Sequence, residues 1–269
     1  MGENSLIGWT DHTFNPWAGC SRISPGCQDC YADNDWARRW HPDKPLWRRH
    51  GQRMVMSDST WRNPVKWNRE AQQANRPAFT FCASMADVFE DHPGVVDART
   101  RLWDLIDATP WLRWQLLTKR PENVARMVPW ADRWPDHVLL GTSVENQQYA
   151  DTRLPVLRSL PVAVRFLSCE PLLGPVELDL DGIGWVIVGG KSGGRPRPFD
   201  LEWARSIRDQ CAAAGIPVFV KQMGTAWARA NGHRGKGISD GQEPALWPED
   251  LRVQQIPPAV PAASVDALL

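Results

Sequence analysis

Apolar and polar residues alternate along the chain in units of about 25 residues, each a short apolar run followed by a longer amphipathic segment. The short runs are nearly continuous in apolar and β-branched residues, which is typical of parallel strands covered on both faces. The repeated order of strand and amphipathic segment is typical of βα units. The pattern predicts seven strands, at residues 8–14, 78–83, 113–118, 137–143, 164–170, 184–190 and 216–222.

The segments between these strands predict helices. Apolar side chains recur at helical spacing in 96–108 and 201–214, and Gly215 follows the second segment at the position of a helix C-cap. The irregular segment 35–75 is too long for a simple βα connection, so we expect it to contain helices of its own. The Pro- and Ala-rich residues 256–269 have no periodic pattern and predict a loosely ordered tail.

Polar residues follow nearly every predicted strand. The sequences at these strand ends are ASMAD, TKRPEN, TSVENQ, SCEPL, GGKSGG and KQMG. In a parallel barrel these ends converge on one mouth, where active sites are built, whereas an open sheet spreads them along an edge. We therefore predict an α/β fold in which residues 1–255 form one parallel (β/α) TIM-like barrel, full or partial, with about six to seven strands. The segment at about 35–75 is an irregular insertion in this barrel, and no second domain is expected.

Charge and hydropathy limit the possible partners. The chain has 31 Lys and Arg and 31 Asp and Glu, so only local patches can argue for a polyanionic partner. No run approaches the roughly 18 apolar residues of a membrane-spanning helix, and the N-terminus, MGENSLIGW, lacks the features of a signal peptide. We expect a soluble, cytoplasmic protein with no membrane partner.

Three of the six cysteines lie close together in the sequence, at Cys20, Cys27 and Cys30. In a reducing compartment such a group is more often a metal site or a catalytic group than a disulfide. The other three stand singly in apolar segments and are predicted to be core residues; they are Cys82, Cys169 and Cys211.

The odd number of clustered cysteines leaves two kinds of metal site open. A structural zinc site needs a fourth ligand, which His12 or His41 can supply. A 4Fe-4S cluster bound through three cysteines instead leaves one iron open for a non-protein ligand. A third interpretation is a metal-independent barrel enzyme in which the cysteines are incidental.

With these motifs in order, the chain resembles the radical S-adenosylmethionine superfamily, and most closely a phage-associated family of radical-SAM-like proteins with a three-cysteine motif. The resemblance covers most of the chain. Its motifs are TDHTFNPWAGCSRISPGCQDCYA, FCASMADVFED, LLTKRPEN, LGTSVENQ, FLSCEPLLGP, VIVGGKSGG, FVKQMG and DGQEPALWPEDL. The commonest superfamily spacing has three residues between the first two cysteines, whereas six separate Cys20 and Cys27 here. Lys191 also stands where we expect an acidic residue in the family.

The resemblance implies a cluster loop after the first strand, in which Cys20, Cys27 and Cys30 hold a 4Fe-4S cluster and S-adenosylmethionine binds the open iron. An electron donor then reduces the cluster, and the cofactor is cleaved to a 5′-deoxyadenosyl radical that abstracts a substrate hydrogen. Such a reaction suits nucleobase or nucleic-acid modification or repair, or a small phosphorylated metabolite. The alternative is a non-enzymatic iron–sulfur or zinc protein that binds nucleic acid.

By analogy with the superfamily, polar residues at the strand ends hold the cofactor. Ser84, Met85 and Asp87 are expected to meet its amino group. The other candidates are Ser143, Glu145 and Asn146 for the ribose or carboxylate, and Ser168 and Glu170 for substrate or cofactor. Three of these residues also have structural interpretations, since Asp87 can cap a helix, Asn146 can serve a turn, and Glu170 can be a loop carboxylate before Pro171.

Basic side chains directly follow apolar strands at Lys119, Arg120 and Lys221, which predicts an anionic ligand at the mouth, either the cofactor carboxylate or a substrate phosphate. Together with Glu170, Lys119 and Lys221 are our candidates for catalytic residues.

Further cationic stretches lie at 38–53, 191–198 and 228–236. Arginines interleaved with tryptophans suit phosphate contacts and base stacking, so a nucleotide or nucleic-acid substrate is one hypothesis. The tryptophans in question are Trp36, just before the first stretch, and Trp40 and Trp47 within it. Solvated helix faces and ordinary surface loops are the alternative interpretation.

Overall fold

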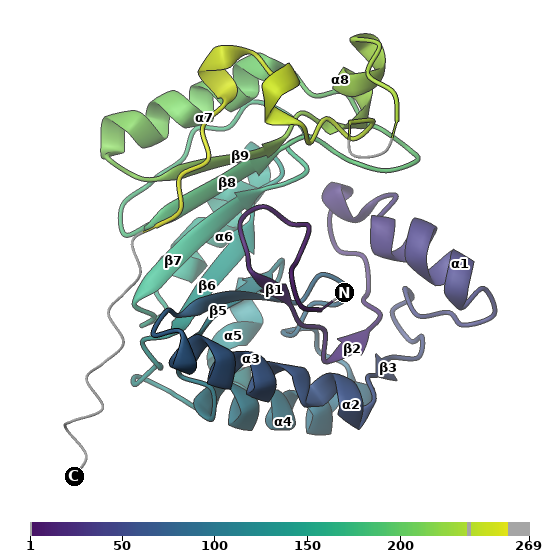
Figure 1. Ribbon diagram of the computed structural model, residues 1–269, viewed down its shortest axis with the longest axis vertical. Coiled ribbons are helices and arrows are strands. Elements are labelled where there is room, and N and C mark those ends of the chain that lie inside the picture. Colours follow the sequence, from purple (N-terminus) through teal and green to yellow (C-terminus); the bar gives the residue numbers. More distant parts are fainter. Residues whose placement is uncertain (1, 236–237, 258–269) are drawn as a thin grey trace.

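The computed structural model describes residues 2–235 and 238–257 and contains a curled sheet of seven parallel strands (Figure 1). The strands are neighbours in the order in which they occur along the chain. They are β1 (His12–Thr13), β4 (Ala78–Cys82), β5 (Leu112–Thr118), β6 (Val138–Ser143), β7 (Val164–Cys169), β8 (Trp185–Gly189) and β9 (Val218–Gln222). The predicted α/β fold is therefore confirmed as a partial TIM-like barrel.

The sheet has an apolar core on each face, because successive side chains of a strand point to opposite faces. The outer core lies between the strands and the covering helices, whereas the inner core fills the concave side. The inner core consists of Trp9, Phe81, Leu139, Phe166, Trp185, Ile187 and Phe219. Figure 1 shows the sheet curling around the N-terminal segment, which supplies Trp9.

The first strand is shorter than the predicted range 8–14. The amide of Thr10 donates to the carbonyl of Ile7 (3.2 Å), so these residues form a turn. The turn directs Trp9 into the concave face, where its ring centroid lies 4.6 Å from that of Phe81. Burial of this large indole therefore outweighs continuation of the strand.

Helices of different lengths pack on the outside of the sheet, as expected for βα units (Figure 1). They are α3 (Asn63–Gln73), α4 (Val96–Asp107), α5 (Val124–Met127), α6 (Gln147–Arg158) and α7 (Leu201–Ala214). Both predicted helices are present, and Gly215 ends α7 in the left-handed conformation with φ of 68°. A short helix, α8 (Gly224–Ala230), follows β9.

The insertion contains several short elements, as predicted. They are a π-helix η2 (Ala32–Ala37), α1 (Arg38–Trp40), β3 (Met54–Val55) and α2 (Asp58–Trp61). Strand β3 pairs antiparallel with β2 (Trp17–Ala18), which lies just before the first clustered cysteine. The single-turn 3-10 helices are Pro25–Cys27, Pro93–Val95, Pro121–Asn123, Pro244–Leu246 and Glu249–Leu251.

The three solitary cysteines are buried in the core, as predicted: Cys82, Cys169 and Cys211 are all fully enclosed. In the described part of the chain, no helix combines the length and the apolar character that crossing a membrane requires. Most of the predicted tail, from residue 258 onward, lies outside the described residues, as does Lys236 of the third cationic stretch.

Candidate functional site

The segment 19–31, here called the cysteine loop, lies across the carboxyl ends of four strands. Each strand contributes the residue two positions after its last one, namely Ser84, Arg120, Glu145 and Lys191. The contacts are Tyr31 hydroxyl to Ser84 carbonyl (2.6 Å), Arg120 to Ser21 carbonyl (2.7 Å), Ser24 hydroxyl to Glu145 (2.7 Å) and Lys191 to Asp29 carbonyl (2.7 Å). The three cysteines are thereby held at the mouth of the half-barrel.

The three clustered thiols are all free of disulfides and only partly exposed. Arg120 Nη1 donates toward the sulfur of Cys20 (3.6 Å), and the Ser24 hydroxyl lies 3.4 Å from the sulfur of Cys27. Burial raises the pKa of the Cys20 and Cys30 thiols, so metal binding would have to displace their protons.

Within residues 2–235 and 238–257, no three His, Cys, Asp or Glu side chains gather closely enough to hold a metal ion. The two histidines considered for a zinc site pack against tryptophans instead. His12 stacks on Trp67 with ring centroids 4.4 Å apart, and His41 lies 5.0 Å from Trp36.

The donor chemistry of the cysteine loop nevertheless fits an iron–sulfur cluster. Thiolates are the protein ligands of such clusters, and three free thiols stand on one loop. Hydrogen-bond donors directed at the sulfurs are the usual outer contacts of cluster ligands, and Cys20 has such a donor in Arg120.

Asp87 joins the ends of β4 and β5. One carboxylate oxygen accepts from the hydroxyl of Thr118 (2.8 Å), and the other accepts from the amide of Lys119 (3.0 Å) and from Arg120 (2.8 Å). The oxygen that accepts from Thr118 also accepts from the amide of Phe89 (3.0 Å). The carboxylate therefore orients Arg120 toward the cysteine loop. It also stabilises the turn that leads from Asp87 to Phe89.

Glu90 ties the cysteine loop to the insertion. Its carboxylate accepts two hydrogen bonds from the guanidinium of Arg53 (2.7 and 2.8 Å) and two from the amide and hydroxyl of Ser21 (2.7 and 2.6 Å). Burial alone would raise the pKa of Glu90, but these hydrogen bonds and the charges of Arg53 and Arg120 lower it below the ordinary value.

Glu145, just after β6, contacts the cysteine loop from the side of the sheet. Its side chain is fully buried, and it forms an ion pair with Lys119 and accepts from the Ser24 hydroxyl. Arg153 lies 3.7 Å from its second oxygen. The backbone at Gly26 passes so close that a Cβ there would overlap the Glu145 carboxylate. Glu145, a candidate for cofactor binding, is thus engaged by the loop itself.

The remaining candidates for cofactor binding lie at the same mouth. Asn15 holds the turn after β4, since its side chain contacts the Ser84 hydroxyl (3.0 Å) and accepts from the amide of Met85 (2.7 Å). Asn146 caps α6 by accepting from the amide of Tyr149 (3.3 Å). The other two are the buried Ser143 and Ser168, at or near the last residues of β6 and β7.

The three basic residues predicted to meet an anionic ligand each pair with a carboxylate. Lys119 pairs with Glu145, and Arg120 pairs with Asp87. Lys221 lies 2.9 Å from Glu170, and both of these side chains are partly exposed. The Lys221–Glu170 pair spans from β9 to the end of β7 across Gly189 of β8, where a Cβ would lie 3.0 Å from Glu170.

The loop between β8 and α7 holds the cysteine loop from the other side. Lys191, where we expected an acidic residue, is buried and donates to the carbonyl of Asp29, while Arg195 pairs with the Asp29 carboxylate (2.8 Å). Arg197 donates to the carbonyl of Pro25 (2.8 Å). Burial lowers the pKa of Lys191. Cations of the second cationic stretch therefore bind this chain's own loop.

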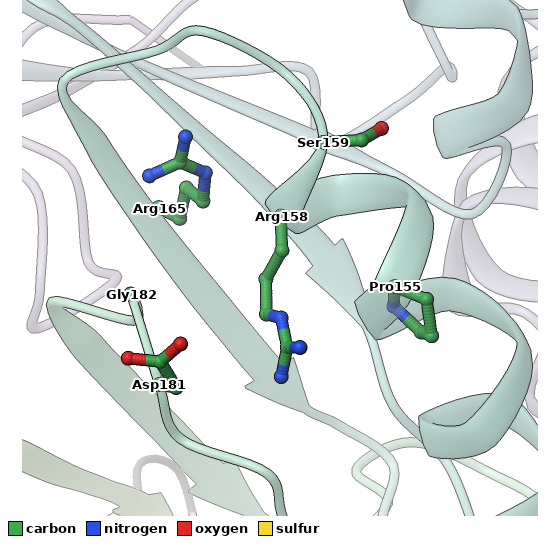
Figure 2. Close-up of a pocket in the computed structure, with 6 residues that line it drawn as sticks. All are labelled: Pro155, Arg158, Ser159, Arg165, Asp181 and Gly182. Atoms are coloured by element: carbon green, nitrogen blue, oxygen red, sulfur yellow. The ribbon is translucent and has the colours of Figure 1, made fainter.

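Two pockets lie at opposite ends of the strands. The first borders the cysteine loop and is lined by Asp29, Asn34, Asp35, Arg38, Gly194 and Arg195. The second lies at the amino ends of β7 and β8, where Figure 2 shows Arg158, Arg165 and Asp181 around an open hollow. Arg158 at this end forms an ion pair with Asp179. Of these two pockets, the first adjoins the candidate site.

The site residues that sequence reasoning missed include Asn15, Arg53 and Glu90. Glu90 stands in the quoted motif FCASMADVFED, and Arg53 closes the first cationic stretch. Glu90 stands beside Asp91, and Arg53 is the last Arg of a basic segment, so the sequence shows their charges but not that they pair.

The fold and site define a class, an α/β half-barrel with a three-cysteine loop fixed at the carboxyl ends of its strands. The chain belongs to the family described as "Protein of unknown function (DUF5131)", whose model matches residues 4–247. No curated protein and no solved structure matches the chain.

Proposed function

We propose that the protein is a radical S-adenosylmethionine enzyme in which Cys20, Cys27 and Cys30 hold a 4Fe-4S cluster. The observation that carries this proposal is the anchoring of one loop with three free thiols over the carboxyl ends of parallel strands. When bound, the cluster would supply one electron to cleave S-adenosylmethionine and start hydrogen abstraction from the substrate.

The chain's own residues would position the ligands of this reaction. Arg120 donates to the backbone carbonyl of Ser21 in the loop and to the sulfur of Cys20. The turn after β4 presents Ser84 and Met85 beside the loop, held by Asn15. These groups suit the polar end of the cofactor, because they stand next to the thiols and are fixed by their own hydrogen bonds.

Glu170 and Lys221 are the candidates for proton movement on the substrate side. Their 2.9 Å separation allows a proton to pass between carboxylate and amine, and both side chains remain partly exposed. Lys119 is less available, since its amine is paired with the buried Glu145.

The proposal is tested by anaerobic reconstitution of the full chain with iron and sulfide. We expect a broad visible absorption band and, after reduction, release of 5′-deoxyadenosine from S-adenosylmethionine. Replacing any one of Cys20, Cys27 or Cys30 by Ala should abolish both, whereas Cys211→Ala, a buried thiol on α7, should leave both in place. A colourless protein that holds one zinc ion would overturn the proposal.

A further inference from the structure

A cationic surface projects from the insertion beside the cysteine loop. The π-helix η2 begins two residues after Cys30 and continues directly into α1. Figure 1 shows α1 at the side of the molecule, apart from the sheet. We call this surface the Trp40 patch; it consists of Arg38, Arg39, Trp40, Lys44, Arg48 and Arg49, all of them exposed.

The cations of the Trp40 patch have no carboxylate partner among the described residues. Arg62, Arg69 and Arg133 are also exposed without an ion pair in that part of the chain, but they stand apart in the sequence, whereas the patch gathers its cations within residues 38–49. Arg76, Arg101 and Arg126 each pair with an aspartate, at 3.4, 2.8 and 2.8 Å. In the described ranges 2–235 and 238–257, the five cations of the patch form no such pair. The sequence gives one reason, since Asp43 is the single acidic residue between positions 36 and 53. Their charge is therefore left for an anionic partner.

An exposed tryptophan lies among these charges. Trp40 is 62% exposed, whereas Trp47 of the same insertion is 8% exposed and packs at 6.4 Å from Trp36. The guanidinium of Arg39 lies 5.3 Å from the centre of the Trp40 ring. A large indole that the fold does not bury, with one arginine against its ring and others nearby in the sequence, is a combination that stacks bases and contacts phosphates in proteins that bind single strands.

The Trp40 patch is continuous with the mouth of the half-barrel. Arg38 of the patch lines the first pocket together with Asp29, which stands between Cys27 and Cys30. Arg195 lines the same pocket from the β8–α7 loop. A chain of nucleotides that stacks on Trp40 would therefore run toward the cysteine loop.

We propose that the Trp40 patch binds single-stranded nucleic acid and delivers a nucleotide to the mouth. As a statement about substrate class, this inference rests on the proposed function. As a statement about binding, it requires only the patch. A single strand fits better than a duplex, because a base inside a duplex must be flipped out before it can stack on a side chain or reach a buried site.

The inference is tested by fluorescence anisotropy with a short labelled single strand of mixed sequence, the matching duplex, and the full chain with and without reconstituted iron. We expect the single strand to bind with and without iron, and affinity to fall as salt rises. Each lost phosphate contact should make the slope of log K against log salt less steep by about 0.7.

Three variants separate stacking from charge. Trp40→Ala should weaken binding by about tenfold, and Trp40→Phe should retain most of the affinity. The triple variant R38Q/R39Q/R49Q should weaken binding and flatten the salt slope by about 2. A matched control, R76Q/R101Q/R126Q, removes the same charge from arginines that are paired elsewhere on the surface and should bind as the parent does.

Several outcomes would overturn the inference. These are no binding at low salt, equal loss of affinity in both triple variants, or binding to vesicles of anionic lipid and not to strands. Failure of the proposed function can be told apart from failure of this inference. A protein that binds strands but forms no iron–sulfur cluster contradicts only the proposed enzyme activity. A protein that forms the cluster and cleaves S-adenosylmethionine but binds no strand contradicts only the inference.

Discussion

The guanidinium of Arg120 donates to groups on three residues. It donates to the carbonyl of Ser21, to the carboxylate of Asp87 and toward the sulfur of Cys20. A planar group with five donors can satisfy all three at once, which an ammonium cannot do with the same geometry. The residue therefore links the thiol to the strand ends, and its charge lies next to the proposed cluster.

We expect Arg120→Gln to make the midpoint potential of the reconstituted cluster more negative. Removing a positive charge and a donor to sulfur stabilises the oxidised, less negative state of the cluster relative to the reduced one. Redox titration followed by visible absorbance measures the shift. Arg126→Gln, which removes a surface charge paired with Asp91, is the control and should leave the potential unchanged.

Breaking a buried ion pair can also unfold the site, at a cost of about 3–5 kcal/mol. The double variant R120Q/D87N removes both partners and leaves the net charge of the pair unchanged, so it should fold better than Arg120→Gln. Its potential should lie between those of the parent and Arg120→Gln, because loss of the Asp87 carboxylate offsets loss of the guanidinium charge. An unchanged potential in folded Arg120→Gln would contradict a role for Arg120 in tuning the cluster.

Gly26 shows how closely the cysteine loop fits its support. A side chain at this position would meet the buried Glu145 carboxylate, which Lys119 and Ser24 hold in place. We expect Gly26→Ala to destabilise the protein by about 1–3 kcal/mol and to lower the iron content after reconstitution. Urea unfolding and iron analysis measure the two effects.

Gly174→Ala is the matched control for this change, because nothing lies within 4 Å of a Cβ at Gly174. Equal iron content in the two glycine variants would show that the close approach at Gly26 has no role in shaping the proposed metal site.

Among the elements, the segment between β4 and α4 organises the mouth. Its Asp87 holds the end of β5, and its Glu90 holds both the cysteine loop through Ser21 and the insertion through Arg53. One short connection thereby fixes three parts of the chain that are distant in sequence.

We expect acid to loosen this connection. The pKa of Glu90 is lower in the folded protein than its ordinary value of 4.5. A carboxyl with a lowered folded pKa contributes stability that is complete above the unfolded pKa and is lost as pH falls from there through the folded pKa. Melting temperatures measured between neutral pH and pH about 3 should therefore fall more steeply below about 4.5 in the parent than in Glu90→Gln.

Glu243→Gln is a suitable control for this titration, since Glu243 is an exposed carboxyl whose side chain accepts from the amide of Ala245. Its pH profile should follow that of the parent. Identical profiles for Glu90→Gln and the parent would contradict the role assigned to Glu90.

At the scale of the whole molecule, the half-barrel is closed on its concave side by its own N-terminal segment. Trp9 fills this side and contacts Phe81 and Trp185, from opposite halves of the sheet. The N-terminal turn thus supplies part of the core that further strands supply in a complete barrel.

Trp9→Ala is expected to lower the free energy of unfolding by about 3–5 kcal/mol. The matched control is Trp40→Ala, which removes an exposed indole and should change stability by less than about 0.5 kcal/mol. Urea unfolding followed by circular dichroism measures both. Similar losses in the two variants would contradict the distinction between core and surface tryptophans.

The sequence predicted the strands well because continuous apolar runs such as 113–118 are distinctive of buried parallel strands. It also placed the cysteines at the mouth, since a loop after the first strand has little choice of position. It did not predict the turn at Trp9, because burial of one indole depends on aromatic partners from strands far along the chain. Ion pairs such as Lys119 with Glu145 were missed for the same reason: the charges are visible in sequence, but their distances are not.

The anchoring of the cysteine loop also has a consequence in time. Arg197 reaches a carbonyl of the loop across 172 residues of sequence. During synthesis from the N-terminus at about 5–20 residues per second, this contact can form only some 10–30 s after the loop has been made. Until then the three thiols lack their last support and are open to oxidants or to stray metal ions. For the proposed cluster, this order of folding favours delivery of iron to a finished chain rather than to a growing one.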